Sequence, residues 1–278
     1  MDKADSSGVQ LYVESTGDGP AIVFVHEFAG DHRNWEPQVR HLAPTHRCIT
    51  FNARGYPPSD VPGRIDDYGQ DQAVADIAAV IRHCGLDRAH VVGLSMGGYA
   101  TLNFGITHPD KALSLTICGA GHGSDPQTRE QFLKDSAELA ERMVTLGMEK
   151  GTEHYANNAS RRRFGQKDPA GFAAFNRQFA EHSATGSSLT MRGYQLRRRT
   201  IYQLEEEMRR IAAPTLIVTG DDDDPCIEPS LFMKRTIPGA RLWVVPRTSH
   251  TVNLEEPVWF NDVVGRFIAE VDSGRWQP

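Results

Sequence analysis

Short apolar runs alternate with longer amphipathic stretches along most of the chain. The apolar and β-branched runs predict strands at residues 21–25, 47–52, 89–94, 111–119, 214–220 and 241–245. The amphipathic stretches predict helices at residues 35–42, 71–84, 99–108 and 254–271. This alternation predicts an α/β fold with a mostly parallel sheet and helices on both of its faces. Residues 9–15 and 21–25 are expected to form an opening pair of strands joined by a turn at residues 17–20.

The alternation stops between about residues 122 and 202. This segment holds helical stretches separated by glycines and a proline, without a convincing strand. It is too long to be a loop without structure of its own in a compact domain. We therefore expect a helical cap at residues 122–202, inserted into an α/β core formed by residues 1–121 and 203–278.

Charge and composition argue against several classes of function. The 278 residues carry a net charge of −6, which gives no support for binding to nucleic acid or to an anionic membrane. No apolar run approaches the ~20 residues of a membrane span, and Met1–Gly8 lacks the apolar region of a secretory signal. The four cysteines form no Cys-x-x-Cys pair, so we expect no metal site and a reduced, cytoplasmic protein. No cofactor is expected either, because the sequence has no Gly-x-Gly-x-x-Gly or P-loop motif.

The most informative motif is Gly93-Leu94-Ser95-Met96-Gly97. It connects a predicted strand to a predicted helix. A Gly-x-Ser-x-Gly sequence in that context is typical of a nucleophile elbow, a sharp turn that holds the serine hydroxyl clear of the sheet. The amide of the residue after the serine can then point at the same reaction centre. Ser95 is therefore the candidate nucleophile.

Acidic residues and a histidine follow the last two predicted strands. Residues 221–224 are four consecutive aspartates directly after one strand, and His250 follows the other. Open α/β sheets place their sites beyond the carboxyl ends of the strands, so Ser95, an aspartate and His250 can meet there. A serine becomes a nucleophile when an imidazole takes its proton, and a carboxylate fixes the tautomer of that imidazole.

In these loops the chain resembles the α/β-hydrolase superfamily, in particular its serine carboxylesterases and enol-lactonases with a helical cap. Gly220-x-x-Asp223 is similar to the acid loop of that family, and Ser249-His250 is similar to its histidine loop. The resemblance implies that Ser95 is the nucleophile, His250 the general base and Asp223 the acid that orients it. The alternatives for the acid are the neighbouring aspartates and one after an earlier strand: Asp221, Asp222, Asp224 and Asp125.

The resemblance also implies an oxyanion hole. His26-Glu27-Phe28-Ala29-Gly30 matches a family loop that usually begins His-Gly, and by that match the backbone amides of Phe28 and Met96 bind the oxyanion. Glu27 departs from the usual glycine. We expect its side chain to turn outward, because a carboxylate beside the hole would oppose negative charge on the substrate. Arg54, in a loop that matches the family only partly, is expected to order that loop rather than touch substrate.

These residues predict a serine hydrolase that cleaves a carboxylic ester, a lactone or a related acyl bond of a small molecule. Carbon–carbon bond hydrolases and small-acid amide hydrolases share the triad and stay open as alternatives. A cofactor-independent dioxygenase of the same fold also stays open, because Asp31-His32-Arg33 loosely resembles that group. The complete triad disfavours a non-enzymatic receptor, and Ser95 argues against dehalogenases and epoxide hydrolases, which use aspartate at the elbow. Whether the chain forms a homo-oligomer is left open.

Two runs of three arginines, at residues 161–163 and 197–199, fall in the expected cap. We expect both runs to form solvated faces. The alternative is that one arginine reaches inward to hold a carboxylate of an anionic substrate. His26, His122 and His182 are expected to be ordinary polar residues, although His122 follows a strand end and is the one placed to line a pocket.

Overall fold

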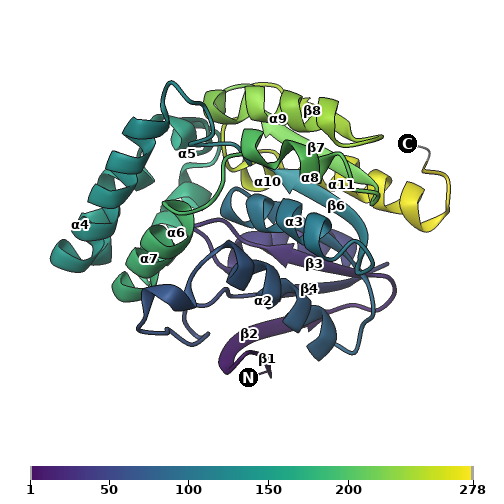
Figure 1. The fold of residues 1–278 in the computed structure, drawn as a ribbon, viewed down its shortest axis with the longest axis horizontal. Coiled ribbons are helices and arrows are strands. Elements are labelled where there is room, and N and C mark those ends of the chain that lie inside the picture. Colours follow the sequence, from purple (N-terminus) through teal and green to yellow (C-terminus); the bar gives the residue numbers. More distant parts are fainter. Residues whose placement is uncertain (1, 277–278) are drawn as a thin grey trace.

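An eight-stranded sheet runs through the protein, whose computed structural model describes residues 2–276 (Figure 1). The strands lie in the order β1-β2-β4-β3-β5-β6-β7-β8. The pairings of β1 with β2 and of β2 with β4 are antiparallel, and the others are parallel. The strands are β1 (Asp2–Ser6), β2 (Val9–Thr16), β3 (Ala21–Val25), β4 (Arg47–Phe51), β5 (Ala89–Leu94), β6 (Ala112–Cys118), β7 (Thr215–Gly220) and β8 (Arg241–Val245). The predicted, mostly parallel sheet is confirmed.

The predicted pairing of residues 9–15 with residues 21–25 is wrong. β2 pairs with β4, where Val13 lies opposite Phe51, and β4 separates β2 from β3. The burial of the strands explains the difference. Every residue of β3 and four of the five residues of β4 are buried, so both strands belong inside the sheet. The exposed end of β2 suits a place near the edge instead.

Alternate residues of the central strands face opposite sides of the sheet. In β3, Ile22 and Phe24 belong to one apolar cluster and Val23 and Val25 to the other, because strand side chains alternate between faces. The first cluster includes residues of α1 (Glu36–Leu42) and α11 (Pro257–Asp272). The second includes residues of α2 (Gln70–His83), α3 (Met96–Thr107) and α9 (Asp224–Thr236). Helices therefore cover both faces, as predicted.

The chain between β6 and β7 forms helices. They are α4 (Arg129–Ala156), α5 (Arg162–Lys167), α6 (Pro169–Ala180), α7 (Ala184–Thr190) and α8 (Glu205–Met208). α4 is interrupted at Gly147, whose φ of 77° favours glycine. Beyond this break the chain folds back, so that Gly151 packs against the backbone of Arg142. In Figure 1, α4, α6 and α7 lie together beside one end of the sheet, on the left.

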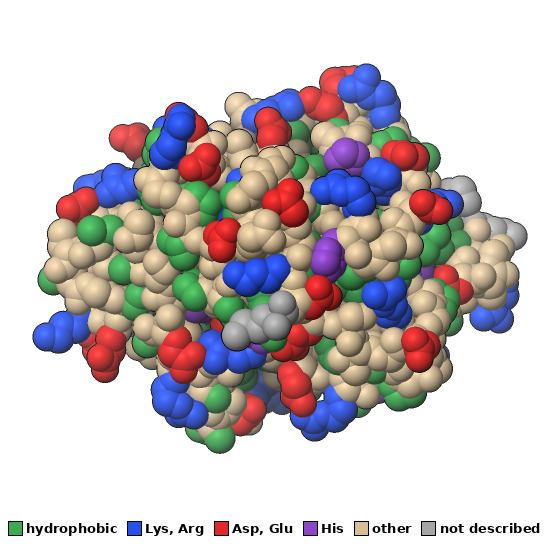
Figure 2. Space-filling view, turned by 90° about the horizontal axis from the view of Figure 1, so that it is seen from below, with side chains coloured by type: hydrophobic (Ala, Val, Ile, Leu, Met, Phe, Trp, Pro, Cys, Tyr) green, Lys and Arg blue, Asp and Glu red, His purple; other side chains and the backbone are tan. Residues whose placement is uncertain are grey.

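Short helical turns complete the chain: η1 (His32–Trp35), η2 (Ile65–Asp67), η3 (Ala159–Arg161), η4 (Met191–Gln195), η5 (Tyr202–Leu204) and α10 (Val252–Glu255). Among the described residues, no helix is both long and apolar enough to cross a membrane. Acidic and basic side chains are interspersed over the face seen in Figure 2, in keeping with a chain of 36 acidic and 30 basic residues.

A buried ion pair orders the loop after β4. Arg54 donates from Nε to Asp76 of α2 at 2.9 Å and from Nη1 to the carbonyl of Asp67 at 2.8 Å. Both members of the pair are buried. Because this contact uses both ends of the guanidinium, Arg54 orders its own loop, as the sequence indicated.

Candidate active site

Ser95 stands at a strained turn between β5 and α3. Its φ of 56° and ψ of −111° lie outside the regions that residues other than glycine usually occupy. Glycines on both sides make the turn possible. A Cβ at Gly97 would lie 2.1 Å from the carbonyl oxygen of Val25, and one at Gly93 would lie 2.2 Å from the carbonyl oxygen of Gly97. Because backbone atoms occupy that space, only glycine fits at these two positions.

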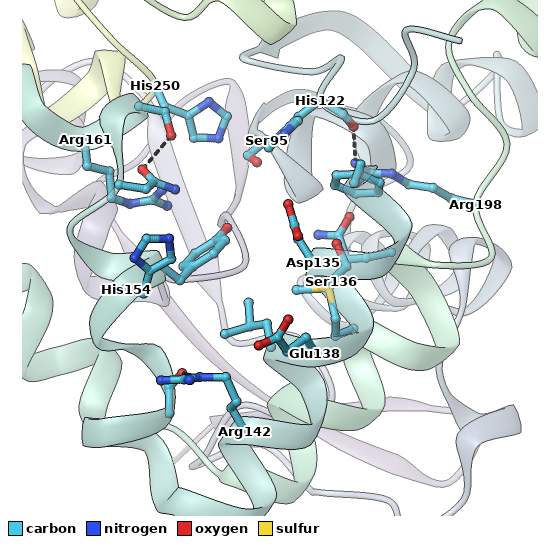
Figure 3. A pocket seen from close by; sticks show the side chains of 18 residues that line it. Ser95, His122, Asp135, Ser136, Glu138, Arg142, His154, Arg161, Arg198 and His250 are labelled. Carbon is cyan, nitrogen blue, oxygen red and sulfur yellow. Dashed lines mark hydrogen bonds between the residues drawn. The ribbon is translucent and has the colours of Figure 1, made fainter. Parts of the chain in front are cut away.

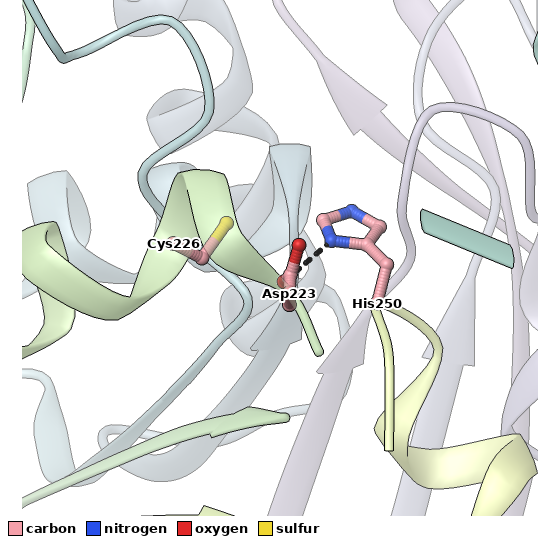
Figure 4. A group of neighbouring side chains, drawn as sticks. All are labelled: Asp223, Cys226 and His250. Atoms are coloured by element: carbon pink, nitrogen blue, oxygen red, sulfur yellow. Dashed lines mark hydrogen bonds and ion pairs between the residues drawn. The ribbon is translucent and has the colours of Figure 1, made fainter. Parts of the chain in front are cut away.

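His250 and Asp223 meet beyond the carboxyl ends of β8 and β7. Nδ1 of His250 lies 2.8 Å from Oδ2 of Asp223, and both side chains are buried (Figure 4). An ionised carboxylate only accepts hydrogen bonds, so Nδ1 carries the proton and Nε2 is left as a base. Ser95 and His250 line one cavity, and Figure 3 shows both side chains at the same end of it.

Of the five candidate aspartates, Asp223 is the one whose carboxylate lies at hydrogen-bond distance from His250. The others face solvent or bond within their own loops: Asp221, Asp222, Asp224 and Asp125. Asp223 is 1% exposed, and the chain brings it inward at the residue that precedes α9.

The contact between Asp223 and His250 sets the charge of both groups. Burial alone would lower the pKa of His250, but the Asp223 carboxylate outweighs burial and holds that pKa above its ordinary value. Burial would likewise raise the pKa of Asp223, and His250 holds it below its ordinary value. Asp223 is therefore ionised at neutral pH, and His250 is a stronger base than an isolated histidine.

Cys226 of α9 lies beside this pair (Figure 4). Ligand atoms of Asp223, Cys226 and His250 fall within 4.8 Å of one another, a spacing that a metal ion can use. However, Sγ of Cys226 donates to the carbonyl of Gly119 at 3.3 Å, and His250 bonds Asp223. Burial raises the pKa of the Cys226 thiol well above its ordinary value, so the thiol keeps its proton. This bonding fits a neutral thiol beside an acid–histidine pair better than a metal centre.

Polar contacts hold the loop after β3. His26 donates from Nδ1 to the carbonyl of Glu27 at 2.7 Å and accepts at Nε2 from the amide of Ala53 at 3.0 Å. Burial lowers the pKa of His26 to about 4, so the ring is neutral. The hydroxyl of Tyr56 donates to the carbonyl of Phe28 at 3.0 Å. Within residues 2–276, the amides of Phe28 and Met96 donate to no protein acceptor.

The expectation that Glu27 turns outward is wrong. Its side chain is 1% exposed and forms an ion pair with Arg161, which is also 1% exposed. Pairing makes burial of this carboxylate tolerable, because the guanidinium replaces the water that it loses. The neighbouring Ser160 accepts a hydrogen bond at its carbonyl from the amide of His250, at 3.0 Å. One short segment of the helical region, η3, is therefore tied to the loops after β3 and β8.

The two arginine runs are not uniformly solvated. Arg161 and Arg198 are 1% and 6% exposed and line the cavity, whereas the other members of the runs are partly or fully exposed. The guanidinium of Arg198 lies 3.7 Å from the centroid of the Tyr99 ring and donates from Nη2 to the carbonyl of His122 at 2.9 Å. The sequence does not distinguish these two arginines from their neighbours, because six identical side chains carry no signal of direction.

The cavity has a volume of about 430 Å³ and lies between the strand ends and the helical region (Figure 3). Its walls include His122, the histidine that the sequence placed at a strand end, and residues of α4, η3 and η4. His122 is exposed on the cavity wall. His26 and His182 do not line this cavity.

The chain is similar over nearly its whole length to proteins of known fold. The family model for the α/β hydrolase fold matches residues 20–257. The chain is 27% identical to the 3-oxoadipate enol-lactonase 1 of Acinetobacter baylyi, over 95% of each chain. It is 24% identical to a putative 2-succinyl-6-hydroxy-2,4-cyclohexadiene-1-carboxylate synthase of Bacillus subtilis, over 96% of this chain and 97% of the relative.

Solved structures share the fold. The enol-lactonase of Burkholderia xenovorans has a TM-score of 0.83 and 22% identity, covering 97% of this chain and 100% of its own. A malate-bound esterase of Thermogutta terrifontis has a TM-score of 0.84 and 22% identity, covering 97% of this chain and 98% of its own.

Proposed function

The chain belongs to the α/β-hydrolase fold family and is a hydrolase, and on this basis we propose that it is a serine hydrolase of small carboxylic esters or lactones. One observation carries the proposal. The buried Asp223–His250 pair and the strained elbow serine Ser95 open on one cavity. A serine, a histidine and a buried carboxylate in this arrangement are the groups that acyl transfer requires.

The proposed reaction has two stages. Nε2 of His250 takes the proton of Ser95, whose Oγ attacks the substrate carbonyl carbon. The bond to the leaving alcohol or enol then breaks, and His250 returns the proton to the leaving oxygen. In the second stage His250 takes a proton from water, whose oxygen attacks the acyl carbon. The bond between that carbon and Oγ of Ser95 then breaks, and His250 returns the proton to Oγ as the acid leaves. Asp223 holds the histidine in the required tautomer throughout.

The amides of Phe28 and Met96 are proposed to stabilise the tetrahedral intermediate. Both are backbone donors that bond to no other residue within the described part of the chain. Met96 begins α3 directly after Ser95, so its amide also lies at the positive end of a helix dipole. Such donors act without reorganisation when charge develops on the substrate oxygen.

The helical region is proposed to act as the cap that shapes the substrate pocket. Residues of α4, η3 and η4 supply most of the cavity wall, and 430 Å³ suits a small molecule. The proposed cap spans residues 122–202, as in the sequence prediction. Three enol-lactonase or esterase names among similar proteins agree with an acyl substrate.

The dioxygenase alternative loses its sequence support. Within Asp31-His32-Arg33, the side chain of Asp31 accepts a hydrogen bond from the amide of Arg33 at 2.9 Å and caps η1. Arg33 reaches Glu181 at 2.7 Å, and His32 bonds Asn52 at 2.8 Å. None of the three lines the cavity. Hydrolysis of carbon–carbon or amide bonds would use the same groups, and a substrate screen separates these reactions.

Fluorophosphonate labelling tests the proposal directly. The reagent should label the wild type at Ser95, whereas Ser95→Ala and His250→Ala should block labelling and ester turnover. Ser136→Ala is the matched control, because Ser136 is a second serine that lines the same cavity and is not proposed to react. Labelling of Ser95→Ala at the wild-type rate would rule out the proposed nucleophile.

A further inference from the structure

Arg161 and Arg198 place two buried cations in the walls of the cavity. They are 1% and 6% exposed, and Figure 3 shows them on opposite sides of Ser95. Neither has a task in the acyl transfer described above. Burial of a charged group is unfavourable unless a partner of opposite charge or hydrogen bonds replace the water that it loses. The partners of each arginine therefore indicate whether its charge is balanced within the protein or is available to bind an anionic ligand.

The charge of Arg161 is met by Glu27. Their contact joins Nη2 of the arginine to a single carboxylate oxygen, Oε2. Within the described chain, Nε of Arg161 and Oε1 of Glu27 have no hydrogen-bond partner. The pair is therefore joined by a single contact. The guanidinium of Arg161 has further N–H donors that this contact does not use.

The charge of Arg198 is met by no acidic side chain among residues 2–276. Its polar contact is with the carbonyl of His122, and its guanidinium stacks on the ring of Tyr99. Its Nε has no hydrogen-bond partner in the same part of the chain. Stacking and a carbonyl contact orient a guanidinium, but they do not balance its charge. The acidic residues on the cavity wall, Asp135 and Glu138, are exposed to solvent.

The stacked ring fixes where Arg198 lies relative to the chemistry. Tyr99 is on α3, four residues after Ser95, and therefore about one helical turn from the proposed nucleophile. A group bound by Arg198 would thus lie a short distance from the scissile carbonyl. This places the charge recognition close to the reacting group of a short substrate.

We propose that Arg198 binds a carboxylate carried by the acyl part of the substrate. The planar guanidinium matches a carboxylate in shape and charge, and the buried setting strengthens the contact. The substrate class is then half-esters or lactones of short dicarboxylic acids. The reaction rests on the proposed serine hydrolase, but binding of the anion does not.

Two matched esters test the selectivity. Monomethyl glutarate carries a free carboxylate. Dimethyl glutarate has the same acyl chain, but its second carboxyl group is a methyl ester and carries no charge. We expect the wild type to prefer the monomethyl ester in kcat/KM. Arg198→Met should reduce the ratio of the two kcat/KM values by about tenfold or more, mainly through KM for the charged ester. Arg198→Lys should recover part of the ratio, because it restores the charge without the planar fork.

Arg199→Met is the matched control, since Arg199 belongs to the same run but is exposed and pairs with Glu207. It should leave the ratio at the wild-type value. A ratio near one in the wild type, or an equal loss on both esters in Arg198→Met, would overturn the inference.

Binding of glutarate, measured by calorimetry, separates this inference from the proposed reaction. We expect glutarate to bind the wild type and Arg199→Met with equal affinity, and to bind Arg198→Met about tenfold or more weakly. Glutarate binding that depends on Arg198 without fluorophosphonate labelling of Ser95 would support the anion site and contradict the hydrolase. Labelling of Ser95 without glutarate binding would support the hydrolase and contradict the anion site.

Discussion

Arg161 and Glu27 form a buried ion pair that joins the helical region to the loop after β3. The two residues lie 134 positions apart in the chain, and each is 1% exposed. Ser160, next to Arg161, accepts the backbone hydrogen bond of His250. The segment that carries Arg161 therefore contacts two loops of the candidate site, so a change in the pair should affect both stability and the charge around His250.

Breaking this pair should destabilise the fold. Glu27→Leu would leave Arg161 as an unpaired buried cation, and we expect the free energy of unfolding to fall by about 3–5 kcal/mol. The double variant Glu27→Leu/Arg161→Met should recover much of that loss, because neither charge is then buried. Urea denaturation measures all three proteins.

Glu36→Gln is the control for the same experiment, because Glu36 pairs with Arg40 on the exposed surface. Its urea midpoint should equal that of the wild type. A wild-type midpoint for Glu27→Leu would show that the buried pair adds nothing to stability.

Loss of the carboxylate beside His250 should disable the reaction without unfolding the protein. We expect Asp223→Asn to lower kcat on the order of 10³–10⁴-fold, by analogy with serine-protease triads, because the imidazole then takes the wrong tautomer. Asp222→Asn and Asp224→Asn change exposed neighbours in the same loop and should cost far less. If Asp224→Asn or Asp125→Asn loses activity while Asp223→Asn stays active, the assignment of Asp223 as the orienting acid is wrong.

The pH dependence of kcat/KM should report the charge around His250. The histidine must be neutral to accept a proton, so activity should fall as pH drops through its pKa. Since Asp223 raises that pKa, the midpoint should lie above the ordinary value of about 6.5.

Glu27 also raises the pKa of His250 and Arg161 lowers it. With a neutral ester as substrate, Glu27→Gln should therefore move the acidic midpoint of the kcat/KM profile to lower pH. Arg161→Gln should move it to higher pH. If the midpoint on the acid side of the kcat/KM profile is the same in both variants as in the wild type, these charge effects are contradicted.

The elbow should not tolerate a methyl group at Gly97. Gly97→Ala places a Cβ 2.1 Å from the carbonyl oxygen of Val25, and a backbone atom cannot move aside as a side chain can. We expect a loss of stability at or above the upper end of the roughly 1–3 kcal/mol typical of overpacking, with turnover strongly reduced. Gly63→Ala is the control, because a Cβ there meets nothing within 4 Å. Thermal unfolding compares Gly97→Ala with Gly63→Ala. A melting temperature of Gly97→Ala equal to that of the wild type would contradict the expected loss of stability.

Local sequence determined the parts of this protein that depend on neighbours in the chain. The turn at Ser95 needs small residues two positions away on each side, and Gly93 and Gly97 therefore predict it. The strands inside the sheet are short apolar runs, and their alternation with helices is enough to predict a mostly parallel sheet. The loops after these strands also carried the resemblance to the α/β-hydrolase superfamily, which the family match over residues 20–257 confirms.

Only the tertiary structure decided which side chains face inward. Nothing in a run of three arginines distinguishes Arg161 or Arg198 from its neighbours, because the direction of each depends on the local turn of the backbone and on partners from distant segments. Glu27 is buried for the same reason, since its cation comes from 134 residues further along. The place of β4 between β2 and β3 likewise follows from burial on both faces of the sheet, a property of the packed core that no single strand encodes.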